Sequence, residues 1–201
     1  MFTKKTKCAC SVLLLLLMLA VFAGGCESSS APPPDEWNSL TFWKSATIQD
    51  VRNGIKAGYS VDTIFDNGHT PLIMASLFNS SPEVIEELIK AGASLGVSRG
   101  GQSPLMAAAS NNRNAEIIRV LLEHGADVNA RGVNGVTPVI LAASSGSSVE
   151  NFMLLVDAGA DLTACLDDGK SVRDLAQNNK KIGPNICDFL DGYIKPEAED
   201  N

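Results

Sequence analysis

The segment Gly68-His-Thr-Pro-Leu72 recurs along this chain at an almost constant interval. Variants of it begin at Gly101, Gly135 and Gly169, so the successive steps are 33, 34 and 34 residues. Self-similarity at this period is typical of chains in which small units stack and bury one another's apolar faces. The sequence therefore predicts a repeat array, which is a scaffold for binding.

Each repeat is predicted to contain two short helices, which we call the inner and the outer helix in chain order. Thr70 can cap the inner helix, and Pro71 suits its first turn, where a missing N–H group costs nothing. The outer helix is an apolar stretch such as residues 84–89, whose i, i+3 and i+4 spacing gives one buried stripe. Gly92 supplies the left-handed residue that ends it, and such glycines are 34, 33 and 34 residues apart.

These motifs resemble the repeats of the ankyrin family. The resemblance rests on Gly-x-Thr-Pro-Leu, on Met106-Ala-Ala-Ala109 in the inner helix and on Gly125-Ala-Asp-Val-Asn129 after the outer helix. It covers about residues 38–194. It implies an all-α fold, an ankyrin repeat solenoid of about five helix-turn-helix units with short hairpin-like loops.

One position departs from the family pattern. The histidine that follows Thr-Pro-Leu in ankyrin repeats is replaced here by Ile73, Met106 and Ile140. Since that histidine makes hydrogen bonds between units in the family, we expect apolar packing to take their place. The first and last units lack the full motif and are predicted to be caps.

Domain boundaries follow from composition and from the repeat register. Residues 1–25 are predicted to be a signal peptide, and residues 26–37 a lipidated cysteine with a flexible Ser/Pro-rich linker. The repeat domain is predicted at 38–195 and an acidic tail at 196–201. The units of the repeat domain are predicted at about 38–66, 67–99, 100–133, 134–167 and 168–195.

The N-terminus resembles the signal peptide of a bacterial lipoprotein. Three lysines precede an apolar run from Val12 to Ala23, which is too short for a comfortable membrane span. Ala23-Gly-Gly-Cys26 resembles the lipobox, in which cleavage falls before a cysteine that then carries the lipid. The resemblance implies lipidation at Cys26, a periplasm-facing place in the envelope and, because Glu27 follows, the outer membrane. The alternative is an ordinary cleaved signal peptide with an unmodified thiol at Cys26.

The charge balance bears on the partner. The formal net charge is −7, and removal of the signal peptide takes away three lysines and no acid, which leaves −10. Nucleic-acid binding needs clustered lysine and arginine, so a nucleic-acid partner is excluded. We expect a monomer that binds another protein of basic or mixed character and meets the membrane through its lipid anchor.

No set of residues predicts catalysis, a cofactor or a metal. His69 and His124 are the two histidines and lie 55 residues apart, whereas a metal site needs convergent ligands. After loss of the signal peptide and lipidation at Cys26, the remaining thiols are Cys165, in a hairpin loop, and Cys187, on an outer helix. These places lie on different sides of a repeat, so we expect no disulfide, and we expect Cys187 to be a core thiol.

The resemblance implies that a partner binds the concave face formed by the hairpin tips and the exposed sides of the inner helices. Phe78 has two readings, a binding anchor beside Leu77 or local core beneath the turn at residues 79–82. The partner-binding residues predicted from the resemblance are Asp66, Asn67, His69, Leu77, Phe78, Arg99, Gln102, Asn111, Arg131, Val133, Asn134 and Val136.

Two roles remain open for such a membrane-tethered binder. It is either an immunity-type antagonist of an effector that reaches the periplasm or an assembly or stabilising factor for a resident envelope enzyme. The alternative from another class is a hydrolase with a site on the concave face, for which no residue set proposes a mechanism. We therefore expect no enzymatic activity.

Overall fold

The computed structural model describes residues 31–146 and 148–193. The predicted signal peptide, the lipidation site Cys26 and the acidic tail at 196–201 lie outside the described residues. The described part is built from helices, and it contains no strand beyond a single bridge between Cys165 and Ser171.

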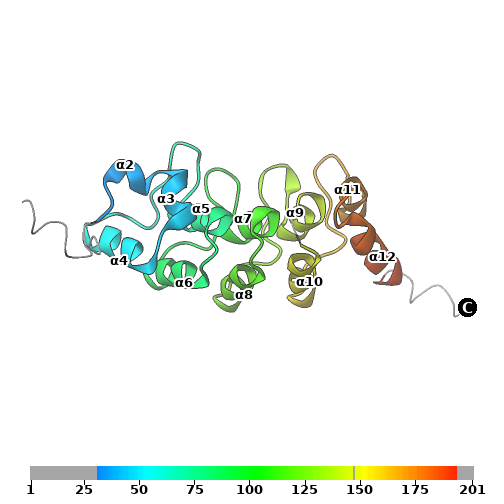
Figure 1. Ribbon diagram of the computed structural model, residues 1–201. Coiled ribbons are helices and arrows are strands. Elements are labelled where there is room, and N and C mark those ends of the chain that lie inside the picture. Colours follow the sequence, from blue (N-terminus) through cyan, green and yellow to red (C-terminus); the bar gives the residue numbers. More distant parts are fainter. Residues whose placement is uncertain (1–30, 147, 194–201) are drawn as a thin grey trace, which may run out of the picture. The chain divides into compact units, whose positions relative to one another are not determined.

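Five helix pairs follow one another along the chain (Figure 1). The inner helices are α3 (Leu40–Ser45), α5 (Pro71–Phe78), α7 (Pro104–Asn111), α9 (Pro138–Ser144) and α11 (Val172–Asn178). The outer helices are α4 (Ile48–Lys56), α6 (Pro82–Lys90), α8 (Ala115–Glu123), α10 (Val149–Asp157) and α12 (Gly183–Tyr193). A short helix, α2 (Pro34–Trp37), precedes them, and one 3-10 turn, η1 (Val133–Gly135), lies in the third hairpin. The predicted all-α solenoid of five units is confirmed.

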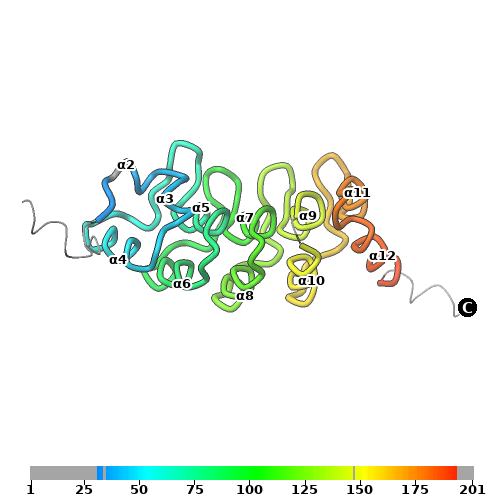
Figure 2. Tube along the Cα trace, viewed as in Figure 1, coloured from blue at the N-terminus to red at the C-terminus, as the bar shows by residue number. Residues whose placement is uncertain are grey.

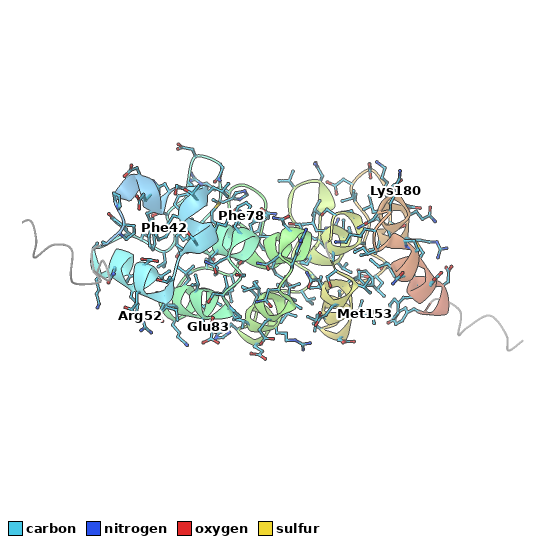
Figure 3. The ribbon with its side chains drawn as sticks, viewed as in Figure 1. Phe42, Arg52, Phe78, Glu83, Met153 and Lys180 are labelled. Atoms are coloured by element: carbon cyan, nitrogen blue, oxygen red, sulfur yellow. The ribbon has the colours of Figure 1, made fainter. Side chains whose placement is uncertain are left out.

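The helices form two rows, because each inner helix packs on the next inner helix and each outer helix on the next outer helix (Figure 2). Ala107, Ala108 and Ala109 are fully buried in α7, and side chains this small let neighbouring inner helices approach closely. The apolar stripes of the outer helices, such as Ile85 and Ile118, complete one continuous core between the rows. Figure 3 shows Phe78 on the inner row and Arg52 and Met153 on the outer row.

The helix ends follow the expected chemistry. The hydroxyls of Thr70, Ser103 and Thr137 each accept a hydrogen bond from the backbone N–H group three residues later, and a proline opens each of these inner helices. Gly92 and Gly125 follow the outer helices with φ angles of 93° and 85°. A side chain there would be strained, which explains why glycine returns at this place.

The folded part begins before residue 38, which differs from the predicted boundary. Pro32 and Trp37 are buried, and the Tyr59 hydroxyl donates a hydrogen bond of 2.8 Å to the carbonyl oxygen of Pro32. The Trp43 indole N–H donates to the Trp37 carbonyl oxygen at 2.8 Å. A side chain at Gly54 would collide with the Trp37 ring. Residues 32–37 therefore pack on the first helix pair. Two tryptophans and a tyrosine bury a large apolar area together here, so this stretch belongs to the folded domain and is not a free linker.

Hydrogen bonds between units are present, and asparagine side chains make several of them. Ile73, Met106 and Ile140 are buried as expected. The side-chain amide of Asn79, at the end of α5, donates to the carbonyl oxygens of Trp43 and Ala46 in the preceding pair at 2.9 and 3.0 Å. Apolar packing is therefore not the only replacement for the family's hydrogen bonds. An asparagine at the end of the inner helix also satisfies carbonyl groups of the neighbouring turn.

Candidate functional site

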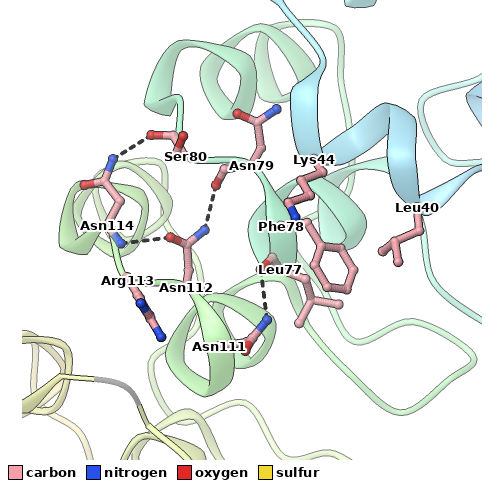
Figure 4. Close-up of a pocket in the computed structure, with 10 residues that line it drawn as sticks. All are labelled: Leu40, Lys44, Leu77, Phe78, Asn79, Ser80, Asn111, Asn112, Arg113 and Asn114. Carbon is pink, nitrogen blue, oxygen red and sulfur yellow. Dashed lines mark hydrogen bonds between the residues drawn. The ribbon is translucent and has the colours of Figure 1, made fainter.

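An open pocket of about 830 Å³ lies beside α3 and at the C-terminal ends of α5 and α7 (Figure 4). Leu40 and Lys44 of α3 and Leu77 and Phe78 of α5 line one side of it, and the turns at 79–80 and 111–114 line the other. Three of the predicted binding residues, Leu77, Phe78 and Asn111, therefore meet in one place.

The first side of the pocket is apolar. Leu40 is 49% exposed, whereas Trp43 of the same helix is fully buried. Leu77 and Phe78 are half-buried, and Phe78 also packs against the main core. Figure 4 shows the Phe78 ring between Lys44, Leu40 and Leu77. The local-core reading of Phe78 holds in part, because the ring contacts the core, and the binding-anchor reading stays a prediction for a ring that also lines the pocket.

The second side of the pocket is polar and held by hydrogen bonds. The side-chain amide of Asn112 donates to the carbonyl oxygen of Asn79 at 2.8 Å, and that of Asn114 donates to Ser80 at 2.7 Å. Asn111 donates to the carbonyl oxygen of Leu77 at 3.3 Å. Because the bonds join successive turns, this wall is fixed before any partner arrives.

The hairpin tips form a second group of predicted residues. Asp66 and Asn67 are exposed and line, with Ile64, a smaller pocket of about 230 Å³. The Asn67 side-chain oxygen accepts a hydrogen bond of 3.0 Å from the backbone N–H of His69, so Asn67 also shapes the tip. The His69 ring is half-buried, and this burial lowers the pKa of its imidazole.

Arg131 and Asn134 are exposed, and both also contact the next hairpin. The Arg131 guanidinium lies 3.7 Å from an Asp167 carboxylate oxygen and donates to the Cys165 carbonyl at 3.4 Å. The carbonyl oxygen of Asn134 accepts the backbone N–H of Asp167 at 3.0 Å, and Asn134 has a φ of 60°. Both residues therefore join the third hairpin to the fourth, a role that the repeat pattern did not predict.

The other predicted tip residues divide by exposure. Arg99 is exposed, whereas Gln102 and Val136 are half-buried beside the caps of α7 and α9. Val133 is 61% exposed and Val97, which is absent from the predicted set, is 43% exposed. The exposed apolar side chain of Val97 is a signal that sequence reasoning missed, whereas Val133 was among the predicted residues.

The two groups lie at opposite ends of the inner helices. The tips directly precede the helices, and the pocket lies where α5 and α7 end. An eight-residue α-helix spans about 12 Å, so one partner can contact both groups.

Within residues 31–146 and 148–193 there is no group of three or more His, Cys, Asp or Glu side chains that could hold a metal ion. Cys165 and Cys187 are both free, and Cys187 is half-buried rather than fully in the core. The expected absence of catalysis, cofactor and metal stays a prediction.

None of the helices in the described part of the chain has the length and apolar character needed to cross a bilayer.

Comparison with known proteins supports the repeat assignment. The family model described as ankyrin repeats (3 copies) matches residues 46–132 and residues 72–165, which together extend over more than half of the chain. No curated protein matches the chain.

Proposed function

The chain belongs to the ankyrin repeat family, and we propose that it binds another protein through the concave face, with the pocket beside α3 and at the ends of α5 and α7 as the anchor. Ankyrin repeats suggest a role in protein–protein interaction, and the chosen face is a finer assignment that rests on the pocket. The observation that carries it is the meeting of Leu40, Leu77 and Phe78 in an open pocket of about 830 Å³.

Two physical arguments support this surface. Partly exposed aromatic and aliphatic groups beside one another are the usual anchors of a protein interface. The asparagine bonds across the pocket, from Asn112 and Asn114 to the preceding turn, reduce the ordering cost of binding. The domain acts in this proposal as a monomeric binder without catalysis.

The binder is held at the membrane by a lipid on Cys26, facing the periplasm, and at the outer membrane if Glu27 acts as the resemblance implies. The packed structure begins at Pro32, so five residues separate it from Cys26. The six steps from Cys26 to Pro32 span at most about 22 Å when the chain is fully extended. The tether therefore confines the repeat domain, and any partner that it binds, to the membrane surface.

The role that we propose is neutralisation of an effector that reaches the periplasm. The formal net charge of the chain is −7, and it becomes −10 when the predicted signal peptide is removed. A strongly acidic binder attracts basic proteins at long range, which suits capture of a basic or membrane-attacking effector.

Site-specific photo-crosslinking tests the binding face. A photoreactive phenylalanine analogue is placed at Leu77 or at Val133 in cells that express the full chain, with Glu123 of the outer helix α8 as the matched exposed control. We expect one crosslinked protein from the first two positions and none from the control. Equal crosslinks from both faces, or none from Leu77, contradict the proposal.

Two further measurements test the anchor and the role. Cys26→Ala is expected to abolish incorporation of a labelled fatty acid into the protein, and labelling that persists in this variant would contradict lipidation at Cys26. The crosslinked partner is then purified and mixed with the binder. Loss of its activity at a ratio of one to one supports antagonism, whereas retained activity in the complex supports an assembly role instead.

A further inference from the structure

We infer that the pocket between α3, α5 and α7 takes a short segment of a partner protein in which an acidic side chain stands beside a large apolar one. The inference rests on the proposed function, because it names the partner's chemistry at the same face. It differs from the charge of the whole chain, which favours basic partners.

The pocket is lined by positively charged side chains, although the protein as a whole is acidic. Lys44 and Arg113 line it and are exposed, and within the described residues neither forms an ion pair. None of the residues that line the pocket is a carboxylate. Several other cations of the described part have a carboxylate within 4.0 Å, namely Arg52, Lys90, Arg119, Arg131, Lys170 and Arg173.

The two cations of the pocket, together with the absence of a carboxylate among its lining residues, give the pocket its selectivity. A carboxylate that enters near either end of the pocket meets one of these cations, Lys44 or Arg113, and displaces no internal partner, so its attraction is not offset by a broken ion pair. A lysine or arginine that enters there meets a like charge in a partly enclosed place, which is repulsive. Charge therefore selects an acidic occupant at the pocket.

The apolar side of the pocket favours a large apolar side chain next to the acidic side chain of the partner segment. Leu40, Leu77 and Phe78 present contiguous apolar surface that water now covers in part. The stem of Lys44 adds to it, because long charged side chains cover apolar surface while their heads stay wet. A leucine, phenylalanine or tryptophan of the partner buries this surface, whereas a purely acidic segment leaves it wet.

The width of the pocket sets the length of the segment. It reaches from α3 across α5 to the turn after α7, which is two steps between neighbouring inner helices. Packed helices lie about 8–10 Å apart, so the two steps amount to about 16–20 Å. An extended segment of about five or six residues covers that length at about 3.3 Å per residue.

Selection from random dodecapeptides displayed on phage tests the inference without choosing the sequence in advance. The bait is the protein purified from cells that express the full chain. We expect enriched peptides to carry Asp or Glu within two positions of Leu, Phe or Trp. A library that yields no enriched peptide, or peptides without an acidic bias, overturns the inference.

Variants then place the binding in the pocket. For a synthetic enriched peptide, Lys44→Glu with Arg113→Glu is expected to weaken the affinity about tenfold or more. The matched control is Lys56→Glu with Lys180→Glu, since Lys180 occupies in the last turn the place of Arg113 and both controls are exposed. The control should leave the affinity unchanged. Equal affinity for the wild type and for the pocket variant overturns the inference.

The apolar side has its own test. Leu40→Ser changes a side chain that is 49% exposed and therefore leaves the fold intact, and it should weaken the peptide about tenfold. Phe78→Ala should do the same, with its urea midpoint measured beside it because Phe78 also packs on the core. Unchanged affinity in Leu40→Ser overturns the inference.

Two outcomes separate this inference from its alternatives. Truncation after Tyr193 should leave the peptide affinity unchanged, and a rise of about tenfold would mean that the chain's own acidic tail fills the pocket, which overturns the inference. If Leu77 crosslinks to a partner whose contacting segment is neutral or basic, the inference fails and the proposed function stands. If Leu77 gives no crosslink, the proposed function fails as well.

Discussion

The turn after α7 and the turn after α9 occupy equivalent places in successive helix pairs but hold the preceding pair differently. In the first, Asn112 donates to the carbonyl oxygens of Ser76 and Asn79, both at 2.8 Å. In the second, Ser145 stands at the helix end and its hydroxyl donates within its own helix, to Leu141 at 3.1 Å. One turn is tied to its neighbour through a side chain, and the other is not.

The missing tie is supplied from the next helix. Asn151 lies in α10, is fully buried, and donates to the carbonyl oxygen of Asn112 at 2.8 Å. The last turn returns to the first pattern, because Asn179 donates to the carbonyl oxygen of Ala143 at 3.1 Å. The comparison teaches that the carbonyl groups at these turns must be satisfied, and that the residue which does so can change.

Among these turns, we expect the largest loss of stability when Asn112 is changed. Asn112→Ala removes both bonds to the preceding pair and leaves buried carbonyl groups without that partner, since the side chain is 5% exposed. We expect the free energy of unfolding in urea to fall by about 2–4 kcal/mol. Asn111→Ala, at an exposed neighbour with one bond of 3.3 Å, is the control and should lie within about 0.5 kcal/mol of the wild type. A loss below that margin in Asn112→Ala would show that packing alone joins the units.

The second turn offers a rescue of intermediate size. Asn151→Ala removes the buried donor to Asn112 and is expected to cost about 1–3 kcal/mol. Ser145→Asn places the asparagine of the other turns at the end of α9, so it should recover about 1 kcal/mol in the Asn151→Ala background and less in the wild type. Urea unfolding of the four proteins in this cycle measures the coupling. Equal effects of Ser145→Asn in both backgrounds would show that the two asparagines do not serve the same carbonyl groups.

The repeat register could be predicted from the sequence because its signals are local. Thr70 with Pro71 caps a helix and Gly92 ends one through backbone constraints that act within a few residues. The start of the folded part could not be read in the same way. Trp37 follows a proline-rich stretch, and its burial depends on Trp43 and Gly54.

The candidate site was predicted in part for the same reason. Leu77 and Phe78 stand out as large apolar residues where a repeat scaffold is wet, and they line the pocket. Leu40 and Lys44 escaped prediction because the first unit lacks the repeat motif that would have set their register. Arg131 was predicted as free to bind, but its contact with Asp167 joins residues far apart in sequence.

The smallest effect is expected at His69, which occupies in the first hairpin the place of Gln102 in the second. Burial lowers the pKa of the His69 imidazole below its ordinary value of 6.5. As the pH falls through this value, the unfolded chain takes up a proton that the folded chain does not, so the free energy of unfolding decreases until the folded imidazole is also protonated. His69→Gln removes this contribution, and His124→Gln is the control. Urea unfolding at neutral pH and at mildly acidic pH should therefore show a smaller loss on acidification in His69→Gln than in the wild type. An equal loss in both proteins would mean that burial of His69 does not affect the stability of the first hairpin.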